Sequence, residues 1–148
     1  MTTNIVDYYF SDFTTSDFDK LIAFWEDTGV GGKNRGDTAD IISDSGENGG
    51  RLILMKLDAT NEIIGSAWVT TDKRRTFLHY FAILKEYRGN GLANDLMDVV
   101  MEHAQLLGLQ FRLEVHEDNT PALELYKKYG FEYLGDYNIY INRDIQKE

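Results

Sequence analysis

An arginine followed by two glycines marks the segment most suited to chemistry, Tyr87-Arg88-Gly89-Asn90-Gly91-Leu92-Ala93. An apolar run over residues 77–84 precedes it and an amphipathic stretch over residues 92–107 follows it. This pattern predicts a strand, a tight turn and a helix. Such a junction directs backbone N–H groups and the positive end of a helix dipole at one point. We therefore expect the turn to bind a phosphate group.

Three kinds of phosphate site contain a glycine turn of this type. A P-loop ends in Gly-Lys-Ser/Thr, whereas this chain continues Gly91-Leu92-Ala93, which excludes it. A dinucleotide fingerprint needs a third glycine where this chain has Asn94, although Glu114 stands at a suitable distance, so a Rossmann-like domain stays an alternative. The third interpretation takes Arg88-x-x-Gly91-x-Ala93 as one unit whose backbone approaches a pyrophosphate.

A second cluster begins at Asn119 and reads Asn-Thr-Pro-Ala-Leu-Glu-Leu-Tyr-Lys-Lys-Tyr-Gly-Phe, ending at Phe131. Together the two clusters resemble the GNAT N-acetyltransferase superfamily. That superfamily carries R/Q-x-x-G-x-G/A at the start of its central helix, followed later by N-x-x-A-x-x-L-Y-x-x-x-G-F. The resemblance covers residues 62–135 well. A proline that the family often has before the arginine loop is replaced here by Lys85.

The resemblance implies that the turn holds acetyl-coenzyme A. The strand edge would pair with the pantetheine arm, as a ligand that adds a strand, and the turn backbone would bind the pyrophosphate. Tyr126 would contact the cofactor and donate a proton to the departing thiolate, and Asn119 would contact the pantetheine or phosphate region. The implied cofactor contacts are Phe81, Ala82, Ile83, Arg88, Gly89, Asn90, Gly91, Leu92, Ala93, Asn119 and Tyr126.

Acetyl transfer to an amine also needs a proton acceptor, because an amine with a pKa of about 10.4 is mostly protonated at neutral pH. His79 is the first candidate, since it lies on the strand that leads to the pantetheine edge and its neutral form accepts a proton. Glu114, His116 and a water chain without any protein base remain alternatives. A backbone N–H near Ile83 or Leu84 would stabilise the oxyanion.

The resemblance also implies which residues would contact the acceptor amine. Trp25, Asn34, Arg35 and Asp37 are the candidate acceptor contacts, and an acidic rim suits a cationic amine. Strand alternation predicts that His79 and Phe81 share one face of the sheet while Tyr80 and Ala82 share the other. The identity of the amine stays open, as does the use of acyl chains longer than acetyl.

The composition of the chain limits the kinds of partner that we expect. The formal net charge of −10 disfavours nucleic acid as a partner. The chain has no cysteine, so we expect no thiolate metal site, no metal and a reducing, cytoplasmic compartment. No apolar run reaches the ~20 residues of a membrane span, and we expect neither membrane association nor a signal peptide. Homodimers are frequent in the family that the chain resembles.

The expected fold class is α/β: one GNAT-like domain over residues 1–148 with a mixed central sheet and helices on both faces. The expected function is an acetyl-coenzyme A-dependent N-acetyltransferase that transfers the acetyl group directly in a ternary complex. The alternative is an acyl-coenzyme A sensor without turnover. We expect helices at residues 16–28, 38–43, 92–107 and 120–129, and strands at residues 4–10, 51–57, 63–71, 77–84, 109–115, 131–134 and 137–141.

Overall fold

The computed structural model describes residues 6–31 and 36–145. The chain divides into two compact units, Met1–Glu114 and Val115–Glu148, which we describe separately.

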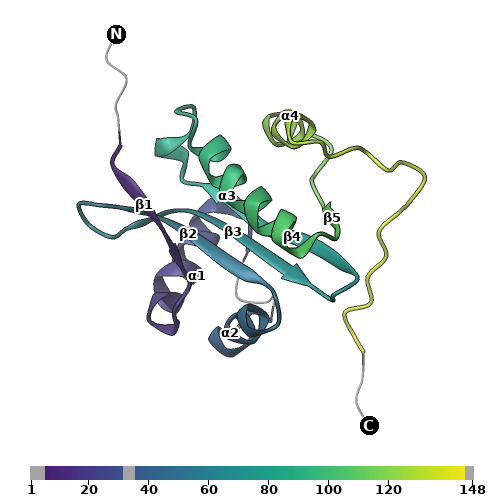
Figure 1. Cartoon of the computed structure of the whole chain (residues 1–148), viewed down its shortest axis with the longest axis horizontal. Coiled ribbons are helices and arrows are strands. Elements are labelled where there is room, and N and C mark those ends of the chain that lie inside the picture. The colour runs from purple at the N-terminus through teal and green to yellow at the C-terminus, as the bar shows by residue number, and fades with distance from the viewer. Residues whose placement is uncertain (1–5, 32–35, 146–148) are drawn as a thin grey trace. The chain divides into compact units, whose positions relative to one another are not determined.

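The first unit is built on a five-stranded sheet in the order β1-β2-β3-β4-β5 (Figure 1). The first four strands pair antiparallel and β5 pairs parallel with β4. The sheet is therefore mixed, as predicted, and the antiparallel pairing excludes the Rossmann-like alternative, which requires parallel βαβ units. The strands are β1 (Tyr8–Asp12), β2 (Arg51–Leu57), β3 (Ile63–Thr71), β4 (Arg75–Ile83) and β5 (Gln110–Leu113).

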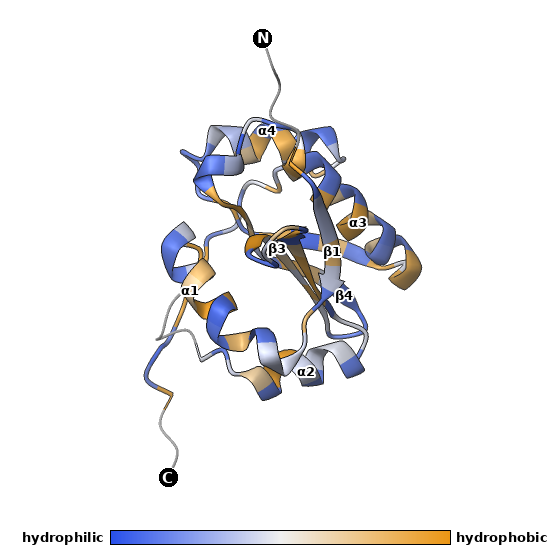
Figure 2. Cartoon of the chain, turned by 90° about the vertical axis from the view of Figure 1, so that its left-hand side faces the viewer, coloured by the Kyte–Doolittle hydropathy of each residue, from blue (hydrophilic) through white to orange (hydrophobic). Residues whose placement is uncertain are grey.

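Helices cover both faces of this sheet, as the sequence predicts. The helices α1 (Phe18–Thr28) and α2 (Ala39–Glu47) lie on one face and α3 (Leu92–Leu107) on the other (Figure 1). Figure 2 shows hydrophobic residues gathered in the strands between the helices. The fully buried side chains of this core include Leu21, Trp25, Ile53, Leu54, Met55, Ile64, Val69, Leu96, Met97 and Val100.

Several element boundaries differ from the prediction, and for α2 the reason is tertiary. The strand predicted at residues 4–10 is observed as β1 at Tyr8–Asp12, and the helix predicted at residues 38–43 continues as α2 to Glu47. The Ser45 hydroxyl donates to the Ile42 carbonyl at 2.8 Å and accepts from the Trp68 indole N–H at 2.9 Å. These bonds hold the last turn of α2 helical despite Gly46.

A bulge interrupts β4 where it faces β3. Trp68 pairs with His79 and Ser66 pairs with Ala82, so Tyr80 and Phe81 both stand opposite Ala67. Tyr80 has a φ of 50°, in the left-handed region that a bulky residue rarely adopts. The alternation predicted for residues 79–82 is therefore wrong: His79 and Tyr80 both lie on the face covered by α1 and α2.

A relay of buried hydrogen bonds fixes this bulge. The indole N–H of Trp25 donates to the Ser66 hydroxyl at 3.0 Å, and this hydroxyl donates to the Tyr80 carbonyl at 2.7 Å. Trp25 and Ser66 are both fully buried. One serine therefore satisfies the buried indole N–H and the Tyr80 carbonyl, and it ties α1 to two strands.

The second unit contains α4 (Thr120–Lys128). Its N-cap is Asn119, whose side chain accepts from the Ala122 N–H at 3.3 Å. The described residues 131–145 contain no helix or strand, so the strands predicted at 131–134 and 137–141 are wrong. Their β-prone side chains are exposed (95% for Tyr133, 89% for Tyr140), and β propensity takes effect only against a packed neighbour.

Replacing Ser66 by alanine should lower the free energy of unfolding by about 1–3 kcal/mol, because a buried indole N–H and a carbonyl lose their partner. Urea denaturation measures the difference. Ser43→Ala, a matched change at a half-buried position of α2, should alter it by less than about 0.5 kcal/mol. Equal losses in the two variants would contradict the relay.

Candidate active site

The glycine turn leads into an uncapped helix. Gly89 and Gly91 have φ values of 84° and 78°, and Gly91 is the N-cap of α3 without any side-chain cap. The Asp95 N–H donates to the Gly91 carbonyl at 3.2 Å and opens the intrahelical ladder. The N–H groups of Leu92 and Ala93 precede that bond and have no acceptor inside the helix. This geometry suits an anion.

Arg88 joins this turn to the end of β4. Its Nε donates to the Ile83 carbonyl at 2.9 Å, and its backbone N–H donates to the Lys85 carbonyl at 3.2 Å. The predicted backbone contact from Arg88 is therefore corrected: Arg88 can offer an anion the rest of its guanidinium group but not its amide. The backbone amides that follow, from Gly89 to Ala93, can still bind a pyrophosphate as predicted.

The strands β4 and β5 separate next to the glycine turn. β5 pairs with β4 from Arg75–Gln110 as far as Leu78–Leu113, whereas β4 continues to Ile83. The predicted pantetheine segment, residues 81–83, lies beyond that pairing. The Leu84 N–H donates to the Ile64 carbonyl at 2.8 Å, so it is not available to an oxyanion and that expectation is wrong for Leu84.

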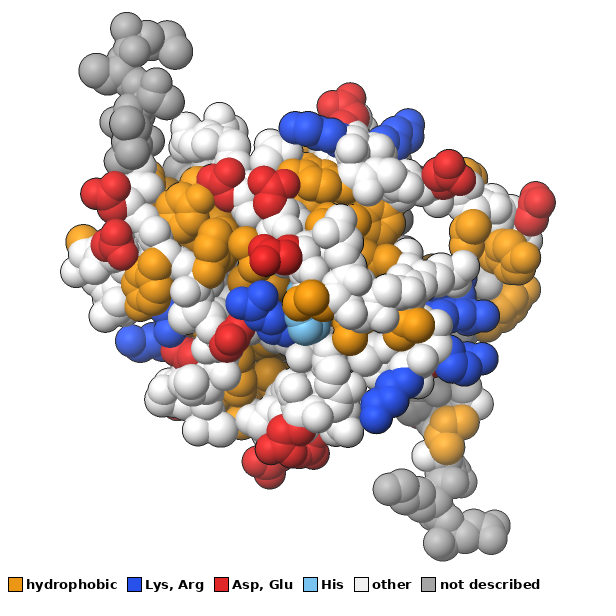
Figure 3. Space-filling view, viewed as in Figure 1, with side chains coloured by type: hydrophobic (Ala, Val, Ile, Leu, Met, Phe, Trp, Pro, Cys, Tyr) orange, Lys and Arg blue, Asp and Glu red, His pale blue; other side chains and the backbone are white. Residues whose placement is uncertain are grey.

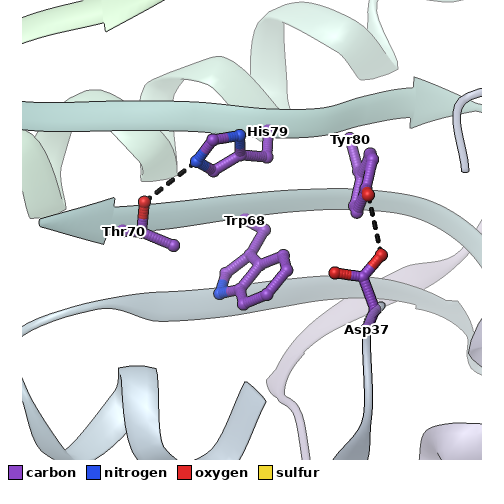
Figure 4. A pocket seen from close by; sticks show the side chains of 5 residues that line it. All are labelled: Asp37, Trp68, Thr70, His79 and Tyr80. Atoms are coloured by element: carbon purple, nitrogen blue, oxygen red, sulfur yellow. Dashed lines mark hydrogen bonds between the residues drawn. The ribbon is translucent and has the colours of Figure 1, made fainter. Parts of the chain in front are cut away.

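A pocket of about 270 Å³ opens on the α1–α2 face of the sheet. The Tyr80 hydroxyl donates to Asp37 Oδ2 at 2.7 Å, and Thr70 Oγ1 lies 2.9 Å from His79 Nε2. Figure 4 shows Trp68 between these two hydrogen-bonded pairs. The lining thus comes from the segment before α2, from β3 and from β4.

The structure brings only part of the predicted acceptor set to this pocket. Asp37 lines it, but Trp25 is fully buried behind it, with its ring 4.4 Å from Tyr80 and stacked at 6.2 Å on Trp68. Trp25 therefore supports the wall and does not face an acceptor. Asn34 and Arg35 fall outside the described residues.

Sequence reasoning missed three lining residues, Trp68, Thr70 and Tyr80. Trp68 and Thr70 are two residues apart on β3 and therefore share one face of the sheet, so strand alternation could have placed both beside His79. Tyr80 joins them only because of the bulge, for which the sequence carries no signal that we recognise.

The pKa of His79 lies below its ordinary value of 6.5. Desolvation lowers it, and the carboxylates of Asp37 and Glu114 act more weakly in the opposite direction. The ring packs edge-on to Trp68 at 5.9 Å. His79 is therefore neutral at pH 7 and able to accept a proton. His116, the alternative base, belongs to the second unit, where its Nδ1 accepts from the Asp118 N–H at 3.1 Å in the turn before α4.

Tyr126 and Asn119 belong to the second unit. Tyr126 is buried, its ring stands edge-on to Phe131 at 5.8 Å, and burial raises the pKa of its phenol to about 12. The hydroxyl is therefore protonated at neutral pH. The side-chain oxygen of Asn119, Oδ1, caps α4, which leaves the side-chain NH₂ group for the predicted cofactor contact.

The described parts of the chain offer no group of three or more His, Cys, Asp or Glu side chains arranged to hold a metal ion. Within the same parts, no helix combines the length and the apolar character needed to cross a membrane. On the face seen in Figure 3, acidic side chains lie at several separate places, so the net charge is not concentrated in one patch there.

The sequence matches the acetyltransferase (GNAT) family over residues 6–131. Among solved structures, an acetyltransferase from Trypanosoma brucei is 19% identical with a TM-score of 0.71, and the match covers 92% of this chain and 99% of that one. Glucosamine-6-phosphate N-acetyltransferase from Arabidopsis thaliana is 15% identical (TM-score 0.68, coverage 94% and 99%). A GNAT acetyltransferase from Elizabethkingia anophelis with acetyl-CoA bound is 21% identical (TM-score 0.58, coverage 85% and 76%).

An NMR titration should place the His79 midpoint below 6.5, and Asp37→Asn should lower it further, because that carboxylate favours the charged ring. A folded-state pKa below the unfolded value also means that His79 contributes stability at higher pH, which is lost as the pH falls below 6.5. A midpoint above 6.5, or a rise in Asp37→Asn, would contradict this assignment.

Proposed function

Because the chain belongs to the acetyltransferase (GNAT) family, we propose that it transfers an acetyl group from acetyl-coenzyme A to a primary amine by direct attack in a ternary complex. Two neighbouring features carry the proposal. The start of α3 has no side-chain cap and follows two glycines in the left-handed conformation, and β4 extends beyond its parallel partner β5. The first feature suits a diphosphate and the second suits an extended amide chain.

In this proposal the amides from Gly89 to Ala93 bind the pyrophosphate, with the Arg88 guanidinium beside them. The pantetheine arm runs along Phe81, Ala82 and Ile83, and the Asn119 NH₂ contacts it. The acetyl-CoA bound to the Elizabethkingia anophelis neighbour supports the choice of coenzyme.

The reaction forms a carbon–nitrogen bond and breaks the carbon–sulfur bond of the thioester. The amine nitrogen must lose a proton, and neutral His79 is the acceptor that we assign. Glu114 raises the pKa of His79, so it strengthens this base instead of acting as a second one. The pocket beside His79 then holds the amine.

Tyr126 is assigned to the leaving group through the family motif. A phenol with a pKa of about 12 is a weaker acid than a thiol, whose ordinary pKa is about 8.5, so full proton transfer to the thiolate would be uphill by roughly 5 kcal/mol. We therefore assign Tyr126 a hydrogen bond to the sulfur as charge develops there. The proton that finally neutralises the thiolate comes from the attacking nitrogen.

The anion site can be tested with two side chains of nearly equal shape. Gly91→Asp and Gly91→Asn carry a similar strain at this left-handed position, which asparagine and aspartate adopt more readily than other side chains, and a Cβ there meets no atom within 4 Å. Gly91→Asp should raise the Kd for acetyl-coenzyme A at least about tenfold relative to Gly91→Asn, because it adds a negative charge beside the diphosphate. Calorimetric titration measures both values. Equal Kd values would remove the diphosphate from this turn.

Tyr126→Phe should lower kcat by about a hundredfold or more while acetyl-coenzyme A still binds, because it deletes only the hydroxyl. Steady-state release of coenzyme A gives kcat, and Tyr133→Phe is the matched control, since that ring is 95% exposed. Near wild-type turnover in Tyr126→Phe would defeat the assignment. Coenzyme binding without turnover of any amine in the wild-type protein would favour the sensor alternative.

A further inference from the structure

Among the residues that the structure describes, one that lines the pocket beside His79 carries a formal charge. Of its described lining residues, Asp37 is a carboxylate, whereas Trp68, Thr70 and Tyr80 are uncharged. Desolvation lowers the pKa of His79, so the fifth side chain is neutral at pH 7 as well. No lysine or arginine lines the pocket among the residues that the structure describes. A cationic group is therefore the charge that this pocket would accept.

The walls are also suited to a cation. Trp68 is held with its ring stacked on the buried Trp25, and Tyr80 packs against the same indole. Aromatic faces attract ammonium groups through their quadrupole, and the attraction grows when the site is partly desolvated. The rings are fixed by packing before any ligand arrives, so little side-chain entropy is lost on binding.

Asp37 is oriented but not saturated by its partner. The Tyr80 hydroxyl donates to one of its two oxygens, Oδ2, at 2.7 Å. A carboxylate has two oxygens and about four acceptor positions, so one hydroxyl leaves room for an ammonium group. Tyr80 thereby positions the carboxylate at the pocket wall (Figure 4).

A nitrogen held in this way cannot be the nucleophile. A neighbouring carboxylate stabilises the protonated form and raises the pKa of an amine, whereas attack on a thioester requires the deprotonated form. An acceptor that uses this subsite must therefore carry two basic nitrogens, one held as a cation and one that reacts. The volume of about 270 Å³ lies just below the usual range for small-molecule sites, about 300–1,000 Å³, which favours a small acceptor.

We propose that Asp37, Trp68 and Tyr80 form a subsite for the non-reacting ammonium group of a small aliphatic diamine, which is the acceptor class of this protein. The inference rests on the proposed acetyl transfer. It extends that proposal because it specifies a second nitrogen and the residues that select it.

The test compares diaminobutane with butylamine, two primary amines of equal chain length that differ in the second nitrogen. In the wild-type protein, kcat/KM should favour diaminobutane by at least tenfold, well beyond the statistical advantage of two equivalent amines. Asp37→Asn should reduce this ratio at least tenfold. Asp40→Asn, which removes the same charge from an exposed position in the first turn of α2, should leave the ratio unchanged.

The possible failures are distinguishable. If both amines are acetylated and Asp37→Asn preserves the ratio, the subsite is wrong and the proposed function stands. If neither amine is acetylated, binding of diaminobutane, followed by the fluorescence of Trp68 and Trp25, decides the subsite without turnover. A Kd at least tenfold weaker in Asp37→Asn than in Asp40→Asn supports it, and equal Kd values or no binding overturn it.

Discussion

The hydrogen-bond relay from Trp25 through Ser66 to the Tyr80 carbonyl is the constraint on which the site depends. It lies between α1 and the two central strands, where water cannot replace a lost partner. By fixing the bulge in β4, it turns two consecutive side chains, His79 and Tyr80, toward the same pocket. A regular strand would have sent one of them to the opposite face.

The other half of the site depends on groups that are left unsatisfied. α3 starts without a side-chain cap, although a serine or aspartate at the N-cap would typically stabilise it by about 1 kcal/mol. In the first turn of α3, the Asp95 carboxylate accepts a hydrogen bond from the Tyr8 phenol and does not cap the helix. The helix thus keeps amides for a ligand at some expense to its own stability. Both halves of the site are anchored on β4 or directly after it.

Local signals predicted the parts of the fold that local chemistry determines. The bounds of β2, β3 and α3 match the prediction because β-prone runs between turn residues, helical periodicity and a terminal glycine mark them directly. The glycine turn followed from its residue types. The bulge at Tyr80, the extension of α2 and the engagement of the Leu84 N–H depend on partners distant in sequence, and the segment 131–145 shows that β-prone residues without packed neighbours form no strand. Tyr80 was missed as a pocket residue for the same reason.

The φ of 50° at Tyr80 has a consequence for how this protein can change. A tyrosine in that conformation costs on the order of 1 kcal/mol or more, and glycine would adopt it without strain. Exchange for glycine would relieve that strain, but it would also remove the ring that packs 4.4 Å from Trp25 and the phenol that orients Asp37. Truncating a packed aromatic ring typically costs about 3–5 kcal/mol, which exceeds the strain, so the same contacts that keep Tyr80 in this conformation also keep its phenol at Asp37.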